Sequence, residues 1–574
     1  MCSEAAAAAA AAGDIVPGRG STTPLHFVVV PLMAQGHMIP MVDLARLLAA
    51  RGVLVTFITT PVNFARIRPI ADRAAASALP IRFVQLTFPV ADAGLPHGCE
   101  SIDLVTSTDH FLPFMNALQL LREPLSAYLR SASDDSDHWP RPSCIVSDNL
   151  HHWTADVARA LDIPRIIFHG PSCFFLLCSL LIERNRAELE AAIAEAESAG
   201  GPAATTLPGL PQPPIRISKH QVINARRSSP GWSKILDTIR EAEDAADGVL
   251  VNSFAELEPC YLERFREEIK KPVWAIGPLS LYKEESEAKA ARGRVSSMDN
   301  TVLFRWLDAQ EAGSVVFVSF GSIARNTAGQ VMELGHGLEA SGRPFVWAVK
   351  EVAEARRREE EAAAPAAMLE EWLSELEKRV EGRGVVIRGW APQALILGHA
   401  ATGMFLTHCG WNSVLESVAA GVVMATWPHF ADQFLNERFV VDVMGIGAAV
   451  GIDEPTIVVG VVADQHGTSS SAAEEEAAAK VRREDVERVV EELMRGGGGG
   501  GREEEAEQRR QRARDLAEKA TRAMDEAQAG SSCHALNDAI HFVSNWAGKK
   551  HIRGPTIFDT WQADEDAKEL ATIA

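Results

Sequence analysis

Apolar residues in the first third of the chain come in short blocks that alternate with amphipathic segments. The run Leu25–Leu32 is apolar except for His26, as in a strand buried on both faces, and apolar residues then recur at helical spacing. Pro40 suits the first turn of that helix, and Gly52 suits its end. A second apolar run, Val53–Thr59, follows at once. This order predicts the start of a parallel sheet.

The same alternation recurs further along the chain. Two apolar runs, Cys144–Ser147 and Arg165–His169, lie on either side of an amphipathic segment, Trp153–Leu161. Strands separated by helical patterns form parallel sheets with helices on both faces. We therefore expect the α/β class, with doubly wound sheets.

A polar stretch divides the chain. No apolar periodicity is present between Gly277 and Asn300, and the strand pattern restarts at Ser314–Phe320. Such a stretch is typical of a domain boundary. The expected organisation is a disordered tail at 1–20, a first domain at 21–280, a linker at 281–300, a second domain at 301–530, a helix at 531–545 and an extension of unassigned role at 546–574.

Three low-complexity segments interrupt the second domain. They are rich in charge, in Ser, Ala and Glu, or in glycine alone, and their compositions do not build a core. We expect surface insertions at 351–371, 454–480 and 496–501. Helical composition returns at Glu503–Gln528 and near Leu536–Val543.

The overall composition is that of a globular protein. Of 574 residues, 47% are hydrophobic and 23% are charged, and the formal net charge of −21 disfavours nucleic acid and anionic membranes as partners. No apolar run approaches the roughly 20 residues of a membrane span, and Ala5–Ala12 lacks the basic flank of a secretion signal. The eight cysteines are scattered without a CxxC pair, which indicates reduced thiols. We expect a cytoplasmic protein, and we expect a monomer.

Two polar residues stand where predicted strands end. His37 follows the first strand, and Asp148 follows Cys144–Ser147. Because the carboxyl ends of parallel strands share one edge, these side chains can meet there. An aspartate beside an imidazole stabilises its protonated form, as a general base requires. Taken alone, a polar residue at a helix start and a capping aspartate explain the pair as well.

The second half holds a candidate nucleotide site. The predicted strand Met404–Thr407 ends in the motif HCGWNS at 408–413, whose glycine permits a tight turn into a helix. The first turn of a helix has unpaired amides that bind phosphate. Glu416, one turn further, can accept ribose hydroxyls, and Trp390 can stack on a base. Ser322, in a Gly-Ser turn after another strand, offers a second phosphate contact.

The window Trp390–Gln433 resembles the signature box of plant secondary-product glycosyltransferases, with WAPQ at its start, HCGWNSVLES in the middle and ADQ at its end. The resemblance extends to GHMIPMVDLARLLAARG, SDNLHHWTADVA, WAIGPL and FVSFGS, so it covers both expected domains. It implies the GT-B fold, two facing Rossmann-like domains with a cleft between them. The first would hold the acceptor and the second the UDP-sugar, and the last helix would cross back to the first.

Each role that the resemblance implies falls on a matching residue. His37 is implied to be the catalytic base and Asp148 its partner. A Gln at position 433 is associated in the family with glucose donors. Trp390 would stack on uracil with Gln393 nearby, and Glu416 would hold the ribose. The implied UDP-sugar residues are Ser322, Trp390, Gln393, His408, Trp411, Asn412, Ser413, Glu416, Asp432 and Gln433.

The implied reaction is the inverting transfer of a sugar, glucose above all, from a UDP-sugar to a hydroxyl of a small plant-type metabolite or hormone. It needs no cofactor beyond UDP-glucose as donor substrate, and we expect no metal. Two Asp-x-Asp strings, at 135–137 and 564–566, are explained by acidic composition. A non-catalytic protein that binds UDP-sugar and metabolite, or a nucleotide-sugar hydrolase or epimerase on the same fold, stays an alternative. A dehydrogenase is disfavoured because no G-x-G-x-x-G joins a strand to a helix.

The sequence does not identify the acceptor. Flavonoids, terpenoids, steroid-like saponins and hormones all fit the resemblance. The candidate acceptor positions are the motif GLPHGCE at 94–100, Phe111, Phe114, Asn149, Phe174 and His429.

Overall fold

The structure is a computed structural model that describes residues 24–550, except 106–107, 132–138, 223–229, 283–297, 325, 350–358, 456–479 and 496–500. The expected tail at 1–20, most of the linker at 281–300, most of the insertion at 454–480 and both Asp-x-Asp strings lie outside the described residues. Within the described part, no helix is both long enough and apolar enough to span a bilayer.

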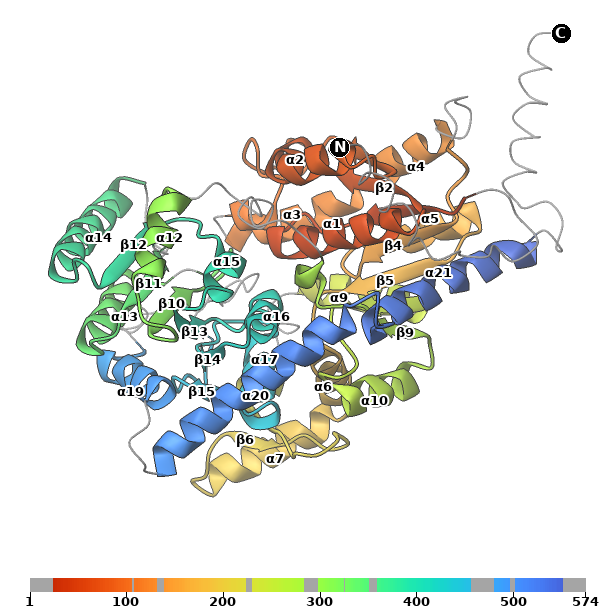
Figure 1. Cartoon of the computed structure of the whole chain (residues 1–574). Coiled ribbons are helices and arrows are strands. Elements are labelled where there is room, and N and C mark those ends of the chain that lie inside the picture. Colours follow the sequence, from red (N-terminus) through yellow and green to blue (C-terminus); the bar gives the residue numbers. More distant parts are fainter. Residues whose placement is uncertain are drawn as a thin grey trace, which may run out of the picture.

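A seven-stranded parallel sheet forms the first domain (Figure 1). The strand order is β3-β2-β1-β4-β5-β8-β9, with Val28 of β1 beside both Thr56 of β2 and Ile145 of β4. The strands are β1 (His26–Val30), β2 (Leu54–Thr59), β3 (Ile81–Gln85), β4 (Cys144–Asp148), β5 (Arg165–His169), β8 (Gly248–Val251) and β9 (Val273–Ala275).

The central strands have apolar residues at consecutive positions because both faces of this sheet are covered. Along β1, Phe27 and Val29 belong to one apolar cluster, whereas Val28 and Val30 belong to another on the opposite face. The flanking helices are α1 (Gln35–Ala50), α2 (Pro61–Ala76), α3 (Phe111–Gln119), α4 (Arg122–Ser131), α5 (Thr154–Leu161), α6 (Cys173–Arg184), α7 (Arg186–Ser198), α8 (Lys219–Val222), α9 (Pro230–Asp244) and α10 (Pro259–Ile269), with a small hairpin of β6 (Ala204–Thr206) and β7 (Arg216–Ser218). Short 3-10 turns lie at Ile102–Leu104, Thr108–His110 and Leu279–Leu281.

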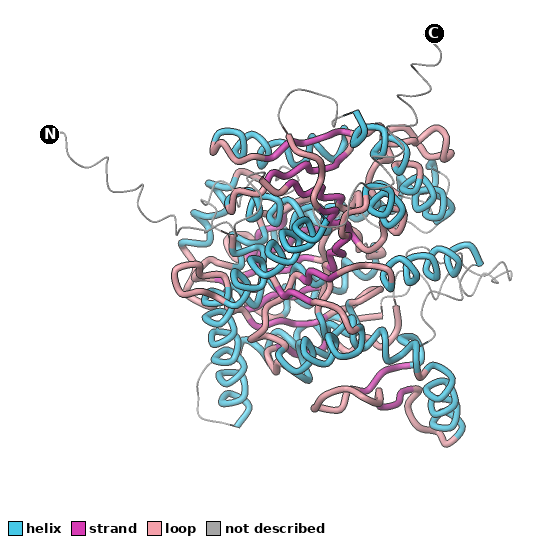
Figure 2. The backbone as a smooth tube through the Cα atoms, turned by 90° about the vertical axis from the view of Figure 1, so that its right-hand side faces the viewer, coloured by secondary structure: helices cyan, strands magenta, loops and turns pink. Residues whose placement is uncertain are grey.

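A six-stranded parallel sheet forms the second domain, in the order β12-β11-β10-β13-β14-β15. Its strands are β10 (Val315–Ser319), β11 (Phe345–Val349), β12 (Gly384–Arg388), β13 (Thr402–Thr407), β14 (Val423–Thr426) and β15 (Gly447–Ala449). Its helices are α12 (Asn300–Asp308), α13 (Ala328–Ala340), α14 (Glu359–Arg379), α15 (Gln393–Leu397), α16 (Trp411–Ala420), α17 (Gln433–Arg438), which continues as a π-helix at Phe439–Val443, α19 (Arg483–Met494) and α20 (Gly501–Ala523). Figure 2 shows the strands running through the body of the molecule with helices on either side. The expected α/β class with two parallel sheets is confirmed.

The last two helices connect the domains. In Figure 1 they run as one blue path from the second domain to the first. α20 packs against α16, and α21 (Ser531–Lys550) packs against β9. On the first domain, Arg51 forms an ion pair with Glu526 (2.7 Å) and donates a hydrogen bond to Asn537 (3.0 Å). The hydroxyl of Ser532 donates to the carbonyl of Gly277.

The start of α1 differs from the prediction. The helix begins at Gln35, so Pro40 lies inside it and not in its first turn. Proline has no N–H to donate to the carbonyl four residues earlier. That carbonyl belongs to Gly36, and it accepts a hydrogen bond of 2.5 Å from Nδ2 of Asn412 in the second domain. The interdomain bond compensates for the one that Pro40 cannot make.

The helix predicted at 503–528 is shorter. α20 ends at Ala523, where the chain reverses and Gly530 lies against the last turn. A Cβ at Gly530 would lie only 2.3 Å from the carbonyl oxygens of Arg522 and Ala523, so only glycine fits this contact. The helix that follows runs to Lys550, beyond its expected end at 545.

Two of the expected insertions also overlap helices. Gly501, the last residue of the 496–501 run, begins α20. The 351–371 segment ends inside α14, where Leu369 is buried in the core of the second domain. Leucine spacing of three and four residues along α14 places Leu369, Leu373 and Leu376 on its inner face.

Candidate active site

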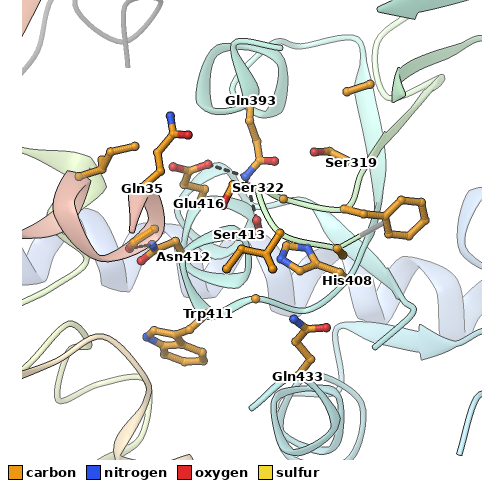
Figure 3. Close-up of a pocket in the computed structure, with 18 of the residues that line it drawn as sticks. Gln35, Ser319, Ser322, Gln393, His408, Trp411, Asn412, Ser413, Glu416 and Gln433 are labelled. Carbon is orange, nitrogen blue, oxygen red and sulfur yellow. Dashed lines mark hydrogen bonds between the residues drawn. The ribbon is translucent and has the colours of Figure 1, made fainter. Parts of the chain in front are cut away.

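A pocket of about 340 Å³ lies between the two domains (Figure 3). Its wall combines the start of α1 from the first domain with loops at the ends of β10, β12 and β13 and the start of α16 from the second. Asp148 is buried behind His37 and does not line the pocket. The other predicted site residues all line it: His37, Ser322, Trp390, Gln393, His408, Trp411, Asn412, Ser413, Glu416, Asp432 and Gln433.

His37 and Asp148 form a hydrogen-bonded pair. Nδ1 of His37 lies 2.7 Å from Oδ2 of Asp148, and the side chain of His37 is 34% exposed whereas that of Asp148 is fully buried. Because a carboxylate only accepts hydrogen bonds, the neutral imidazole carries its proton on Nδ1. Nε2 is therefore left with a lone pair that can take up a proton.

Electrostatics favour a charged form of this pair. Burial alone would lower the pKa of His37, but the carboxylate of Asp148 and, to a smaller extent, that of Asp432 together raise it by more, so the pKa lies above its ordinary value near 6.5. Burial raises the pKa of Asp148, but the imidazole of His37, the ring of His151 and the N–H of Leu150 together lower it by more. Asp148 therefore stays ionised while His37 exchanges a proton.

The imidazole of His408 is held between two glycines. A Cβ on Gly321 would lie 2.5 Å from the ring, and one on Gly410 would lie 2.4 Å from its Nε2. Gly410 was expected to permit a tight turn, but its φ of −59° is open to any residue. The left-handed residue of that turn is Cys409, with φ of +63°. Gly410 is needed instead for the close approach of His408.

The start of α16 holds a connected group of polar side chains. The amide of Gln393 donates to Oγ of Ser413 (3.0 Å) and to Oε2 of Glu416 (2.8 Å), as Figure 3 shows. No side chain caps the helix at Gly410, so its first amides remain available to an anion. Trp390 is half-buried and lines the same pocket. These groups form a polar end suited to a nucleotide diphosphate.

The loop before α17 supplies Asp432 and Gln433. Oε1 of Gln433 accepts the N–H groups of His429 (2.8 Å) and Phe430 (3.2 Å), which leaves its amide nitrogen for a pocket ligand. Burial raises the pKa of Asp432, against a hydrogen bond from Asn436. Among the described residues, no group of three His, Cys, Asp or Glu side chains is placed to hold a metal ion.

Trp411 and Asn412 contact the first domain. The indole N–H of Trp411 donates to the carbonyl of Asn252 in the first domain (2.8 Å), and its ring lies 6.0 Å from that of Phe439 in its own domain. The carboxamide of Asn412 bonds both Gly36 and Asn252. The side chains of both residues therefore already have protein partners across the domain interface.

Several candidate acceptor positions have structural roles instead. Phe174 stacks on Phe439 with ring centroids 4.9 Å apart, and Phe114 is fully buried; neither lines the pocket. Glu100 of the GLPHGCE motif accepts the N–H of Val62 in the first turn of α2 (3.0 Å). Apolar residues at these positions fill the core because large buried rings contribute most to packing there.

The remaining candidates also lie outside the pocket wall. Phe111 is buried against Trp232, and Asn149 donates to Glu243 (3.3 Å). His429 is fully buried between the carbonyl of Trp427 and the amide of Asn326, and burial lowers its pKa to about 4.

Asn252 and Gln35 are among the pocket residues that sequence reasoning missed. Asn252, just after β8, bonds both Trp411 and Asn412. Gln35 is 4% exposed and lines the pocket, and no partner of its amide nitrogen is found within the described structure. Gln35 directly precedes Gly36 and His37, so its position beside a candidate base could have identified it from the sequence. No sequence feature marked Asn252, because it follows the strand without a distinctive motif.

Known proteins share this architecture. The model of the family described as UDP-glucoronosyl and UDP-glucosyl transferase matches residues 300–459, and that of the glycosyltransferase N-terminal domain matches 24–197. The chain is 43% identical over 433 residues to UDP-glycosyltransferase 73C6 of Arabidopsis thaliana, which spans 75% of this chain and 83% of that protein. It is 44% identical over 439 residues to UDP-glycosyltransferase 73E1 of Stevia rebaudiana, with the same shares.

Solved structures agree. Glycyrrhiza uralensis UGT73P12, complexed with glycyrrhetinic acid 3-O-monoglucuronide, matches with a TM-score of 0.73 and 32% identity over 96% of this chain and 99% of that one. Arabidopsis thaliana UGT89C1, complexed with UDP-L-rhamnose, matches with a TM-score of 0.65 and 27% identity over 91% and 100%. The family resemblance and the GT-B fold are confirmed, and the chain belongs to the UDP-glycosyltransferase family.

Proposed function

We propose that this enzyme transfers glucose from UDP-glucose to a hydroxyl of a small plant-type metabolite, with inversion at the anomeric carbon. The observation that carries the proposal is the 2.7 Å pair of His37 and Asp148 at the wall of the pocket that also holds the nucleotide motif. A base and a leaving-group site within one pocket are the two requirements of such a displacement.

The base acts at Nε2 of His37. The acceptor hydroxyl gives its proton to this nitrogen while its oxygen forms a bond to the anomeric carbon. The bond from that carbon to the diphosphate oxygen breaks, and its electron pair leaves with UDP. Attack comes from the face opposite UDP, so an α-linked donor gives a β-glycoside. Asp148 stabilises the imidazolium that forms, which is the role its ionised state supports.

The second domain receives the leaving group. The free amides at the start of α16, together with His408, Ser413 and Ser322, stabilise the negative charge on the diphosphate. Glu416, oriented by Gln393, holds the ribose, and Trp390 stacks on uracil. Asn412 contributes through its backbone because its side chain is bonded elsewhere. In this scheme the charge is neutralised by protein groups, so the reaction needs no metal ion.

The sugar lies against Trp411, Asp432 and Gln433. The amide nitrogen of Gln433 and the carboxylate of Asp432 are the groups that would hydrogen-bond the sugar hydroxyls and so distinguish their orientation. The family relation supports a small-molecule acceptor, and two relatives have been crystallised with such ligands: UGT73P12 with glycyrrhetinic acid 3-O-monoglucuronide and UGT89C1 with quercetin. A phenol or a polycyclic alcohol is therefore the first class to test.

The test is a product assay with purified protein, UDP-glucose and a panel of plant phenolics and triterpenoids, with and without EDTA. We expect mass spectrometry to find one added hexose on at least one acceptor, and we expect UDP release to require that acceptor. Release of UDP without any acceptor would indicate a hydrolase. Binding of UDP-glucose without turnover on any acceptor would indicate a binding protein.

A further inference from the structure

Four chain segments meet through hydrogen bonds beside the catalytic pair. Gly36, which precedes His37 in α1, contacts Asn412 at the start of α16. Asn412 contacts Asn252 at the end of β8, and Asn252 contacts Leu279 in the turn after β9. Only Asn412 belongs to the second domain, so this chain of contacts joins the two domains at the base.

The direction of each hydrogen bond is fixed. The N–H of Leu279 donates to Oδ1 of Asn252 (3.1 Å), so the other end of that carboxamide must be its donor Nδ2. This nitrogen donates to Oδ1 of Asn412 (3.4 Å), which in turn directs Nδ2 of Asn412 at the carbonyl of Gly36 (2.5 Å). The backbone N–H of Leu279 in the first domain thus determines that Asn412 turns its amide nitrogen, and not its oxygen, toward α1.

The receiving carbonyl has lost its usual partner. Inside a helix, the carbonyl of Gly36 would accept the N–H of residue 40, but residue 40 is Pro. The turn that carries His37 is otherwise held by the N–H groups of His37 and Met38, both of which donate to the carbonyl of Ala34. Asn412 therefore supplies the missing restraint on the catalytic turn.

We propose that Asn412 and Asn252 form a carboxamide latch, in which the second domain fixes the position of His37 in the first. Both are positioning residues, and the proposal rests on the proposed role of His37 as the base. The start of α16 faces the diphosphate through its backbone, so the same turn that receives the donor also holds the base. Correct placement of the base then depends on the domain arrangement that binds UDP-sugar. Misplacing a catalytic group by about 1 Å costs about a hundredfold in rate.

Asn252→Asp tests the latch from outside the nucleotide site. One carboxylate oxygen still accepts the N–H of Leu279, but the other now faces Asn412 as an acceptor. Asn412 must turn its nitrogen toward Asp and its oxygen toward the carbonyl of Gly36, where two acceptors repel each other. The shape of the side chain and the backbone carbonyl that receives Trp411 are unchanged.

Two measurements on Asn252→Asp test whether the latch restrains the turn that carries His37. We expect hydrogen–deuterium exchange at the amides of His37 and Met38 to become faster by about tenfold, in the protein alone. With UDP-glucose and the best acceptor of the panel, we expect kcat to fall about ten- to a hundredfold, while the Kd for UDP changes less than about twofold. The exchange measurement needs no turnover, so it separates failure of the latch from failure of the proposed function.

Asn412→Ala and the double variant complete the cycle. If both residues act through one latch, the double variant loses no more rate than the worse single variant. Ser531→Ala is the matched control. It also removes one hydrogen bond to the first domain, the one that Ser531 donates to Glu256 (2.8 Å), but this bond lies away from the pocket. Melting temperatures within about 3 °C of the parent show that each variant is folded.

Opposite outcomes overturn the proposal. Unchanged exchange at His37 and Met38 in both Asn252→Asp and Asn412→Ala would show that the bond does not restrain the turn. Additive rate losses, with UDP affinity lost in Asn412→Ala alone, would show that the Asn412 side chain is a diphosphate ligand and not a latch.

Discussion

The two walls of the pocket are built in different ways. On the first domain, the proposed chemistry depends on one imidazole and one buried carboxylate, His37 in the first turn of α1 and Asp148 at the end of β4. On the second, the polar groups are spread over a helix start and three loops, and several of them bond one another. A reaction that depends on one pair of residues is lost when either is removed, whereas binding that is spread over many residues weakens a little with each one removed. The first wall should therefore control rate, and the second should control donor affinity and donor choice.

His37→Ala should cause the largest loss of turnover among these variants. It removes the base but none of the second-domain contacts, so we expect turnover to fall about a hundredfold to ten-thousandfold while the Kd for UDP stays within about twofold. Steady-state rates and isothermal titration measure the two quantities. Similar losses of turnover and of UDP affinity would show that rate and donor binding are not controlled by separate walls of the pocket.

Gly410→Ala tests the second wall. The added Cβ would lie 2.4 Å from Nε2 of His408, so the ring must move away from its place beside the proposed diphosphate site. Loss of one hydrogen bond to a charged group should weaken UDP binding about tenfold, with the acid limb of the pH profile unchanged. Gly501→Ala is the control, since a Cβ there meets nothing within 4 Å. Equal affinity for UDP in both variants would rule out this role of His408.

Donor choice should show the smallest effect. UDP-galactose differs from UDP-glucose only in the orientation of the 4-hydroxyl, and a site that hydrogen-bonds one orientation leaves its polar groups unpaired with the other. We expect kcat/KM to favour UDP-glucose by at least about tenfold, and Gln433→Ala to reduce that ratio. A preference for galactose in the parent enzyme would mean that Gln433 does not select glucose.

Much of this arrangement could be predicted from the sequence. β1, β4 and β5 were predicted because strands covered on both faces have apolar residues at consecutive positions, here Phe27–Val30, Cys144–Val146 and Ile166–Phe168. The pocket residues were found because their motif is long and because strand ends share an edge. The start of α1 was misplaced since Ala34 at its N-cap carries no capping side chain, and Pro40 was the only visible start signal.

Interdomain contacts were beyond the reach of sequence patterns. Asn252 and Gly36 acquire their roles from residues more than 150 positions away, and nothing in their local sequence encodes that distance. Phe174 illustrates the opposite error. This residue was a candidate acceptor position, but its ring packs in the core between α6 and the π-helix. Periodicity records which face is buried and not what buries it.

The pH dependence of kcat/KM in the parent enzyme and in Asp148→Asn tests the central claim most directly. His37 acts as a base only when neutral, and its pKa is raised by Asp148, so the parent rate should rise with pH through a pKa above 6.5. Without the carboxylate, burial dominates and lowers that pKa. The acid limb of Asp148→Asn should therefore move to lower pH, with a reduced plateau because the imidazolium has lost its partner. An identical profile and plateau in the two proteins would contradict the account.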